Sequence, residues 1–237
     1  MISENNFFSG QLTIYQHVNG YRFSIDPILL AHHVEADNRD TILDIGTGCG
    51  IIPMTLNHRF DVKRIYGVEI QNSLFEIAEK NIKKNKMEKN IQLLLSDIKD
   101  MTQKAMNGPA DIIVTNPPYQ KPGSGRINPE SEKALARHEI KINLKTLLKK
   151  TRSLLKNKGK FYIIYPANRA SELIFEMESF KITPKQLRFV HSFKDSEATM
   201  VICQGIMNGN TGVEIMPPLI IYEDKKIYTK EVLSFIS

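Results

Sequence analysis

A repeated order of apolar strand, turn and amphipathic helix, which begins at Thr41, constrains the fold most strongly. Short apolar runs predict strands, and helical spacing of apolar residues follows most of them. Five strands are predicted, at Thr41–Ile45, Arg64–Glu69, Ile91–Leu95, Asp111–Thr115 and Lys160–Tyr165. Strands that alternate with helices pair in parallel and are covered on both faces. The sequence therefore predicts an α/β fold with a mostly parallel, doubly wound, Rossmann-like sheet.

The segments on either side of this core predict antiparallel strands. Residues 186–193 and 199–207 are two strand-like runs joined by a short polar loop, which predicts an antiparallel C-terminal hairpin at one edge of the sheet. Near the start of the chain, runs at 11–16 and 21–25 flank Asn19-Gly20, a strong signal for a tight hairpin turn.

A short helix is predicted to follow this N-terminal hairpin. Asp26 has the side chain of an N-cap residue, and Pro27 is suited to the first helical position. The apolar residues that come next carry the helix to about Val34. We likewise expect Asn72 to cap a long helix that ends near Lys86.

The composition narrows the class of protein. The chain has 237 residues, a formal net charge of +6 and a pI near 9.1, which favours an anionic partner. Its apolar runs fall short of the about 20 residues that cross a bilayer, and its first residues lack the features of a secretory signal. We expect a cytoplasmic protein without membrane contact. Cys49 and Cys203 match no metal-ligand spacing, so no metal site is predicted.

A glycine-rich loop, Gly46-Thr47-Gly48-Cys49-Gly50, joins the first predicted strand of the core to a helix. This is the context of a nucleotide-binding loop, in which glycines let the backbone approach a ligand. Glu69 follows at the end of the next strand, near the expected ~20 positions after the loop, where a carboxylate can accept hydrogen bonds from ribose hydroxyls. Asp97, just past the third strand, is placed to meet an adenine amino group.

The spacing of the glycines favours one cofactor over another. A dinucleotide loop has the pattern G-x-G-x-x-G, whereas the third glycine here, Gly50, comes one position earlier. Asp44 precedes the loop, and its carboxylate would repel a pyrophosphate but suit a ligand that bears an amino group. The predicted cofactor is therefore S-adenosyl-L-methionine rather than NAD.

The tetrapeptide Asn116-Pro117-Pro118-Tyr119 directly follows the fourth predicted strand. The Asn116 side-chain carbonyl and the Pro117 backbone carbonyl are acceptors that can grip the two N–H groups of a planar amine. Tyr119 offers a flat face on which a base can stack. An amine of this kind is either the exocyclic amino group of a nucleobase or the side-chain amide of glutamine. A plain Pro-rich turn also fits the tetrapeptide taken alone.

The stretch from Lys141 to Lys160 contains several Lys and Arg residues and no Asp or Glu. Lys141, Lys145, Lys149, Arg152 and Lys156 are spaced by three or four positions, which predicts one face of an amphipathic helix. This face is either an ordinary solvated surface or a stripe that follows nucleic-acid phosphates.

The chain resembles class I S-adenosylmethionine-dependent methyltransferases, in the branch that methylates amino groups. The resemblance lies in their ordered motifs, which match Asp44 to Gly50, Glu69, Asp97 and the tetrapeptide. Residues 21–31 and Ala136-Arg137-His138-Glu139 are similar to segments of the tRNA (adenine-N6)-methyltransferases that modify an anticodon-loop adenine of a valine tRNA. The resemblance covers nearly the whole chain. It implies a seven-stranded sheet whose last strand is antiparallel.

The resemblance implies methyl transfer from S-adenosylmethionine to an exocyclic amino nitrogen, with adenine N6 in tRNA as the leading acceptor. The alternatives are an N5-glutamine protein methyltransferase, a guanine-N2 rRNA methyltransferase, a DNA adenine methyltransferase, and a non-catalytic RNA-binding protein on the same fold. No obligate protein partner is expected. We expect one domain over residues 1–237, in which residues 1–35 cover the cofactor site and residues 36–237 form the catalytic core.

The predicted site residues fall into three groups. The catalytic residues are Asn116, Pro117, Pro118 and Tyr119. The cofactor-binding residues are Asp44, Gly46, Thr47, Gly48, Gly50, Glu69, Ile70, Asp97, Ile98 and Asn116. The substrate-binding residues are Tyr119, Arg137, His138, Lys145, Lys149 and Arg152.

Overall fold

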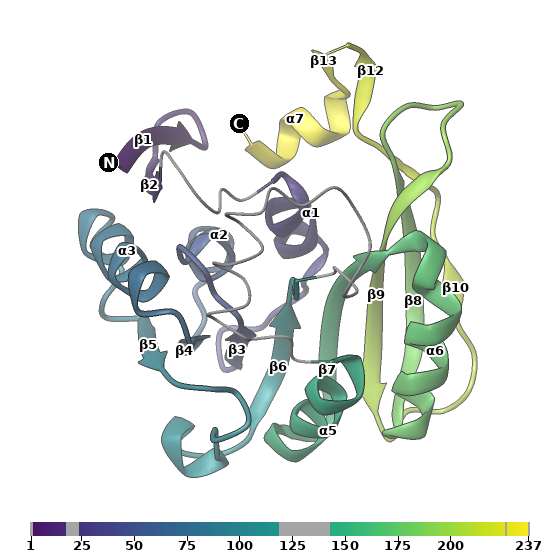
Figure 1. Ribbon diagram of the computed structural model, residues 1–237, viewed down its shortest axis with the longest axis horizontal. Helices are drawn as coiled ribbons and strands as arrows, with labels where there is room; N and C mark the ends of the chain where they lie inside the picture. Colours follow the sequence, from purple (N-terminus) through teal and green to yellow (C-terminus); the bar gives the residue numbers. More distant parts are fainter. Residues whose placement is uncertain (1, 18–23, 119–142, 226, 237) are drawn as a thin grey trace, which may run out of the picture.

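A computed structural model of the chain describes residues 2–17, 24–118, 143–225 and 227–236. A nine-stranded sheet runs through its centre, in the order β10-β8-β9-β7-β6-β3-β4-β5, and β11 also pairs with β8 (Figure 1). Its seven long strands are β3 (Thr41–Ile45), β4 (Arg64–Glu69), β5 (Ile91–Leu95), β6 (Ala110–Thr115), β7 (Leu155–Pro166), β8 (Ile182–His191) and β9 (Ala198–Met207). Two short strands, β10 (Glu214–Ile215) and β11 (Leu219–Ile220), extend the β8 edge.

Strands β3 to β7 pair in parallel, and β9 is antiparallel to both β7 and β8. The mostly parallel sheet of seven long strands and the C-terminal hairpin are therefore confirmed. The hairpin does not end the sheet, because β10 and β11 add short parallel pairings on its outer side.

Helices cover both faces of the sheet because its strands are apolar on both faces. In β3, for example, Ile42 packs into one hydrophobic core and Leu43 into the other. The first core lies under α1 (Asp26–His33), α2 (Ile51–Arg59), α3 (Asn72–Lys84) and α7 (Lys230–Ile236). The second lies under α5 (Leu144–Leu154), α6 (Ala170–Ser179) and the short 3-10 helices η1 (Gln103–Met106) and η2 (Ala167–Arg169).

The N-terminal hairpin differs from the sequence expectation. Strand β2 (Leu12–His17) pairs with the segment before it, β1 (Ile2–Phe7), in antiparallel register. The predicted turn at Asn19-Gly20 lies outside the described residues, and residues 24 and 25 are not in a strand. The apolar alternation of β2 was visible in the sequence, but β1 is a polar segment whose strand depends on pairing with β2.

The two predicted helix caps are each off by one residue. Helix α1 begins at Asp26 itself, with Ile25 in the N-cap position, and the Ser24 hydroxyl donates to Asp26 Oδ2 (2.7 Å). Helix α3 begins at Asn72, whose side chain donates to Glu76 (2.7 Å) instead of capping the helix. Both helices nevertheless start in the predicted segments.

The basic helix is shorter than predicted. Helix α5 ends at Leu154, and Leu155 enters β7, where it is buried and pairs with Ala110. Lys156 therefore lies on a strand, where its Nζ forms an ion pair with Asp111, and Lys141 lies outside the described residues. The continuous stripe predicted from Lys141 to Lys156 is wrong, because strand pairing at Leu155 overrides the helical spacing.

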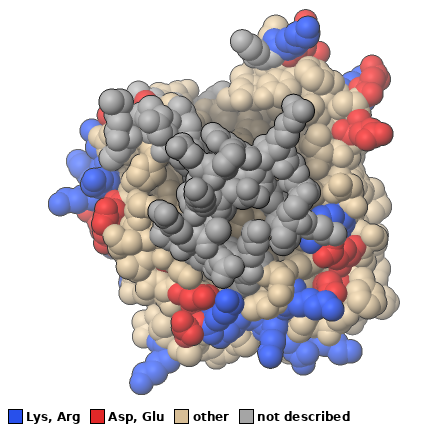
Figure 2. Space-filling model, viewed as in Figure 1, with Lys and Arg blue, Asp and Glu red and all other residues tan. Residues whose placement is uncertain are grey.

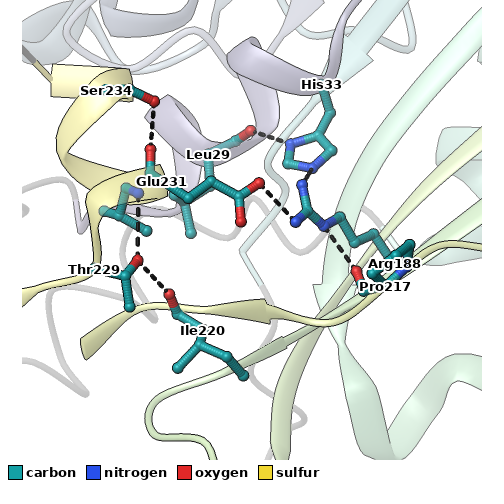
Figure 3. Close-up of polar contacts among 9 residues, drawn as sticks. Leu29, His33, Arg188, Pro217, Ile220, Thr229, Glu231 and Ser234 are labelled. Atoms are coloured by element: carbon teal, nitrogen blue, oxygen red, sulfur yellow. Dashed lines mark hydrogen bonds and ion pairs between the residues drawn. The ribbon is translucent and has the colours of Figure 1, made fainter. Parts of the chain in front are cut away.

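The C-terminal segment returns to the N-terminal part of the chain. The Arg188 guanidinium on β8 donates to the Pro217 carbonyl (3.0 Å) and to Glu231 on α7 (2.7 Å), as Figure 3 shows. It also contacts His33 Nε2 on α1 at 3.0 Å. The other ring nitrogen, His33 Nδ1, lies 2.7 Å from the Leu29 carbonyl. An arginine can only donate and a carbonyl can only accept, so Nε2 accepts and Nδ1 carries the proton, which makes His33 neutral. This network holds α7 on α1. The antiparallel hairpin of β12 (Tyr222–Asp224) and β13 (Ile227–Tyr228) precedes α7.

Candidate functional site

The register of the parallel strands brings the predicted site residues to one edge of the sheet. Ile45 of β3 is opposite Val68 of β4 and Thr115 of β6, so the glycine loop, Glu69 and Asn116 all begin at the same level. Glu69 in turn is opposite Leu95, which places Asp97 two residues past that level. The chain runs from β3 to β4 and β5 on one side and then crosses to β6. The loop after β3 and the tetrapeptide after β6 therefore flank the point where strand order reverses, which is where α/β sheets bind ligands.

The glycine loop has a backbone that only glycine adopts readily. Gly46, Gly48 and Gly50 have φ values of 76°, 57° and 86°. The amides of Gly46 and Thr47 both donate to the Val68 carbonyl, at 2.9 and 3.0 Å. A Cβ added at Gly46 would meet no atom within 4 Å, so the loop leaves open space on that side. The loop is thus fixed to the end of β4 while its outer side stays accessible to a ligand.

Glu69 is buried and its carboxylate is held by backbone amides. Its Oε2 accepts from Gly48 N (2.8 Å), and its Oε1 accepts from Ile70 N (3.0 Å) and Gln71 N (2.9 Å). A carboxylate has about four acceptor positions, so three of them are taken within the protein. This residue orders the glycine loop, a role that the sequence did not predict. At Oε2 it still has capacity for one ribose hydroxyl.

Asp44 is also buried, but its surroundings differ. The side chain is 0% exposed, and neither carboxylate oxygen has a hydrogen-bond partner in the part of the chain that the structure describes. Burial raises the pKa of Asp44 to about 7. The nearby Thr47 hydroxyl, which does not reach hydrogen-bond geometry with either carboxylate oxygen, lowers this pKa in part, and the negative charge of Glu69 raises it further. An unpaired buried carboxylate is costly, and a cationic group placed beside it would remove that cost.

Asp97 lies at the outer end of the same row of strands. Its Oδ1 accepts from Lys99 N (2.8 Å), and its Oδ2 lies 3.7 Å from Lys99 Nζ. The amide of Ser96 donates to the Glu69 carbonyl (2.9 Å), which ties this end of β5 to the end of β4. Ile98 is buried and Ile70 is partly buried. The structure thus places Asp97 and Ile98 just past the end of β5, whose last residue pairs with Glu69.

The tetrapeptide leaves β6 beside the glycine loop. Thr115 Oγ1 donates to the Ile45 carbonyl (2.9 Å), so the last residue of β6 is fixed to the last residue of β3. Asn116 is partly buried, Pro117 is buried and Pro118 is exposed. Tyr119, Arg137 and His138 were predicted to bind substrate, and they lie outside the described residues.

The three predicted basic residues of α5 are exposed and share one helical face. Lys145 forms an ion pair with Glu176 of α6 (3.4 Å), and Lys149 and Arg152 follow along the helix. Because α5 precedes β7, Arg152 lies about 10 Å farther than Lys145 from the edge that carries the glycine loop. Figure 2 shows Lys and Arg gathered along the lower rim of the molecule, over α5. These residues therefore form an exposed basic face at the periphery of the site.

A cavity of about 490 Å³ lies elsewhere, between α3 and β5. Its lining includes Glu79, Lys83 and Leu93 and contains none of the predicted site residues. We therefore assign the chemistry to the edge with the glycine loop. In the described ranges, no three His, Cys, Asp or Glu residues are arranged to hold a metal ion. Among those same residues, every helix is too short or too polar to cross a bilayer.

Sequence reasoning missed one buried residue next to the site. Asn81 lies on the buried face of α3 with Leu74, Ile77, Ala78 and Ile82, and its side-chain amide donates to the Cys49 carbonyl in the glycine loop (2.8 Å). An asparagine within the apolar stripe of an amphipathic helix is the signal that could have found it, because a buried amide needs polar partners.

Comparisons with known proteins agree with this geometry. The family model described as methyltransferase small domain matches residues 23–183. A tRNA1(Val) (adenine(37)-N6)-methyltransferase from Porphyromonas gingivalis is 29% identical over 189 residues, 77% of this chain and 73% of that protein. A protein of the same name from Pedobacter heparinus is 28% identical over 201 residues, 84% of each chain.

Solved structures share the fold. The crystal structure of a predicted O-methyltransferase from Agrobacterium tumefaciens superimposes with a TM-score of 0.68 at 18% identity, covering 88% of this chain and 94% of that one. The family model spans more than half of the 237 residues, including the glycine loop and the tetrapeptide. The chain therefore belongs to the methyltransferase small domain family.

Proposed function

We propose that this protein transfers a methyl group from S-adenosylmethionine to the N6 amino group of an adenine in tRNA. The observation that carries the proposal is the shared sheet edge, where register places a glycine loop and a buried carboxylate, unpaired among the described residues, beside Asn116. The relatives from Porphyromonas gingivalis and Pedobacter heparinus, both named as tRNA adenine-N6-methyltransferases, support adenine and tRNA as the acceptor.

The residues present fit the cofactor. Asp44 offers a buried carboxylate without a partner among the described residues, which suits the ammonium group of the methionine part. The open side of Gly46 leaves room for close approach to the loop, and Glu69 keeps acceptor capacity at Oε2 for a ribose hydroxyl. Asp97 and Ile98 extend the site toward an adenine ring. When bound, the cofactor supplies an electrophilic methyl group on a sulfonium.

The acceptor amine would be held by the tetrapeptide. Its lone pair is delocalised into the ring, so the nitrogen is a poor nucleophile until its geometry becomes more tetrahedral. The side-chain carbonyl of Asn116 and the backbone carbonyl of Pro117 would accept hydrogen bonds from the two N–H groups of the amine. They would also offset the positive charge that develops on the nitrogen. Methyl transfer makes the amino group acidic, so its proton can leave to solvent afterwards, and we assign no general base. Catalysis then comes from orientation and electrostatics.

Substrate contacts beyond the acceptor amine form part of the same proposal. Tyr119 would stack on the adenine, and Arg137, His138, Lys145, Lys149 and Arg152 would contact the phosphates of a folded RNA. Lys145 would first have to leave its ion pair with Glu176. We further propose that the chain is a single catalytic domain that acts in the cytoplasm without an obligate protein partner.

This function is tested by incubation with labelled S-adenosylmethionine and either total RNA, total protein or DNA. The RNA is then fractionated and the modified nucleosides are analysed. We expect N6-methyladenosine in the tRNA fraction. Label confined to protein would instead support glutamine methylation, and N2-methylguanosine in rRNA would support the guanine alternative.

The role of Asn116 is tested by Asn116→Ala. We expect kcat at saturating S-adenosylmethionine to fall by about a hundredfold or more, because the lost carbonyl acts mainly in the transition state. Asn157→Ala, an exposed asparagine on β7, is a matched control that should leave kcat unchanged. Near-normal transfer by Asn116→Ala would contradict the mechanism.

A further inference from the structure

Two asparagines, Asn81 on α3 and Asn85 at the C-cap of this helix, hold the N-terminal hairpin by its backbone. Asn81 Oδ1 accepts from Tyr15 N (2.6 Å), and its Nδ2 donates to the Tyr15 carbonyl (3.0 Å). Asn85 repeats this pattern on Thr13, accepting from its amide at 3.0 Å and donating to its carbonyl at 2.8 Å. Each side-chain amide therefore pairs with one residue of β2 as a neighbouring strand would.

The spacing of the two elements explains why the contacts fit. Asn85 directly follows the last residue of α3 and lies four positions after Asn81, so the helical spacing puts the two side chains on one side, about 6 Å apart along the axis. Residues 13 and 15 are two apart on a strand and expose their hydrogen-bonding groups in the same direction, about 6.6 Å apart. The match allows α3 to satisfy both residues of β2 at once.

Asn81 makes one contact that Asn85 does not. Its Nδ2 also donates to the Cys49 carbonyl (2.8 Å), inside the glycine loop. Asn81 is 0% exposed, so water cannot replace these partners. The loop already packs on α3, since a Cβ at Gly50 would lie 3.5 Å from Ala78 Cβ. Asn85 instead donates to Met54 and to the backbone carbonyl of Asn81.

We propose that Asn81 is a positioning residue of the cofactor site, which holds the glycine loop through the Cys49 carbonyl while β2 fixes the orientation of its amide. The proposal rests on the proposed function in that the loop is taken to bind S-adenosylmethionine. Two of the three hydrogen bonds of Asn81 go to β2, and they determine which end of the amide faces the loop. The hairpin therefore acts on the cofactor site without contributing a side chain to it.

Asn81→Ala and Asn85→Ala form a matched pair for testing this role. Both variants lose the two hydrogen bonds to one residue of β2, and only Asn81→Ala also loses the bond to the glycine loop. Hydrogen exchange of the full-length protein without cofactor measures both regions. The amides of residues 46, 47, 48 and 50 are hydrogen-bonded, so their exchange is slow enough to compare.

In both variants we expect faster exchange in residues 12–17. Only Asn81→Ala should also speed exchange in residues 46–50, by about tenfold, as expected for one lost hydrogen bond. The KM for S-adenosylmethionine should rise about tenfold in that variant with kcat nearly unchanged, because the loop binds the cofactor but does not touch the acceptor amine. Asn81→Ser, which leaves a smaller cavity, gives the same comparison if Asn81→Ala does not fold.

Unchanged loop exchange in the Asn81 variants, or equal acceleration in Asn85→Ala, would overturn the proposal. Titration of the wild-type protein with S-adenosylmethionine tests the function separately. If the wild type does not bind the cofactor, the proposed function fails, whereas the exchange comparison still decides whether Asn81 positions the loop.

Discussion

Asp44 and Glu69 are two buried carboxylates at the carboxyl ends of neighbouring parallel strands, and they are held in opposite ways. Glu69 accepts hydrogen bonds from three backbone amides, those of Gly48, Ile70 and Gln71. Asp44 has no hydrogen-bond partner among the described residues, although it is fully buried. Both residues are buried, so burial does not distinguish their roles.

The two carboxylates differ in the number of hydrogen-bond donors that surround them. A carboxylate surrounded by amides is stabilised as a charged group and can order the loop around it. A buried carboxylate without donors is costly, and it gains most when a cation binds beside it. We infer that Glu69 builds the cofactor loop and that Asp44 recognises the ligand. Four predictions test this contrast.

The largest effect is expected for Glu69→Ala. The change leaves three backbone amides without an acceptor, at about 1 kcal/mol or more each, which would lower Tm by roughly 6 to 12 °C. Cofactor affinity should be lost as well, because Gly48 is released. Thermal unfolding followed by circular dichroism measures the first effect, and calorimetric titration measures the second.

Glu69→Gln serves as the control, since its side-chain carbonyl keeps one acceptor atom. Its Tm should fall by about half as much. If Glu69→Ala were as stable as the wild type, the structural role assigned to Glu69 would be wrong.

Asp44→Asn should change stability and affinity in opposite directions. Removing an unpaired buried charge should stabilise the cofactor-free protein by about 1 kcal/mol, while affinity for S-adenosylmethionine should fall about tenfold to a hundredfold. Urea unfolding and calorimetric titration at pH 8 measure the two quantities.

Asp111→Asn is the matched control, because Asp111 lies near the start of β6, at the end of the sheet away from the glycine loop. The Asp111 carboxylate accepts from Thr41 N (2.9 Å) and pairs with Lys156, so its loss should lower stability and leave cofactor affinity unchanged. A loss of stability in Asp44→Asn would show that Asp44 already has a partner in the free protein.

The smallest effect is a proton exchange near neutral pH. Because the pKa of Asp44 is raised to about 7, this carboxyl is mostly protonated at pH 6 in the cofactor-free protein. A bound cation favours the ionised form, so binding at pH 6 should release up to about one proton. Titrations in buffers with different ionisation enthalpies measure this release, and at pH 8.5 it should vanish.

The same shift predicts the sign of a stability change. Between about pH 4 and 7 the unfolded chain has released the Asp44 proton while the folded protein still binds it. This group therefore makes the cofactor-free protein less stable as pH rises through that window, with no further change above it. Asp44→Asn should remove this contribution. A wild-type profile identical to that of the variant would count against the raised pKa.

Much of the fold could be predicted because it depends on short-range patterns. The strands at Thr41–Ile45, Arg64–Glu69 and Ile91–Leu95 have the predicted bounds, since continuous apolar runs of this length are typical of buried parallel strands. The glycines of the loop were identified correctly because the φ values of Gly46, Gly48 and Gly50 require them. The convergence at one edge follows from parallel pairing alone.

Other features depend on partners that are distant in the sequence. Strand β1 exists because β2 pairs with it, and α5 ends because Leu155 pairs with Ala110. Helix α6 and helix α7 were not predicted. No local pattern indicates which of several polar or apolar segments will find such a partner.

The sequence by itself determined the sheet, the glycine loop, the tetrapeptide and the set of acidic residues that meet at one edge. Only the tertiary structure decided how those acids differ, with Glu69 satisfied by three amides and Asp44 left unpaired among the described residues. It also decided that Asn81 links the loop to β2. The physical reason is that strand and helix periods arise from neighbouring residues, whereas hydrogen bonding of a buried group depends on atoms brought close only by folding.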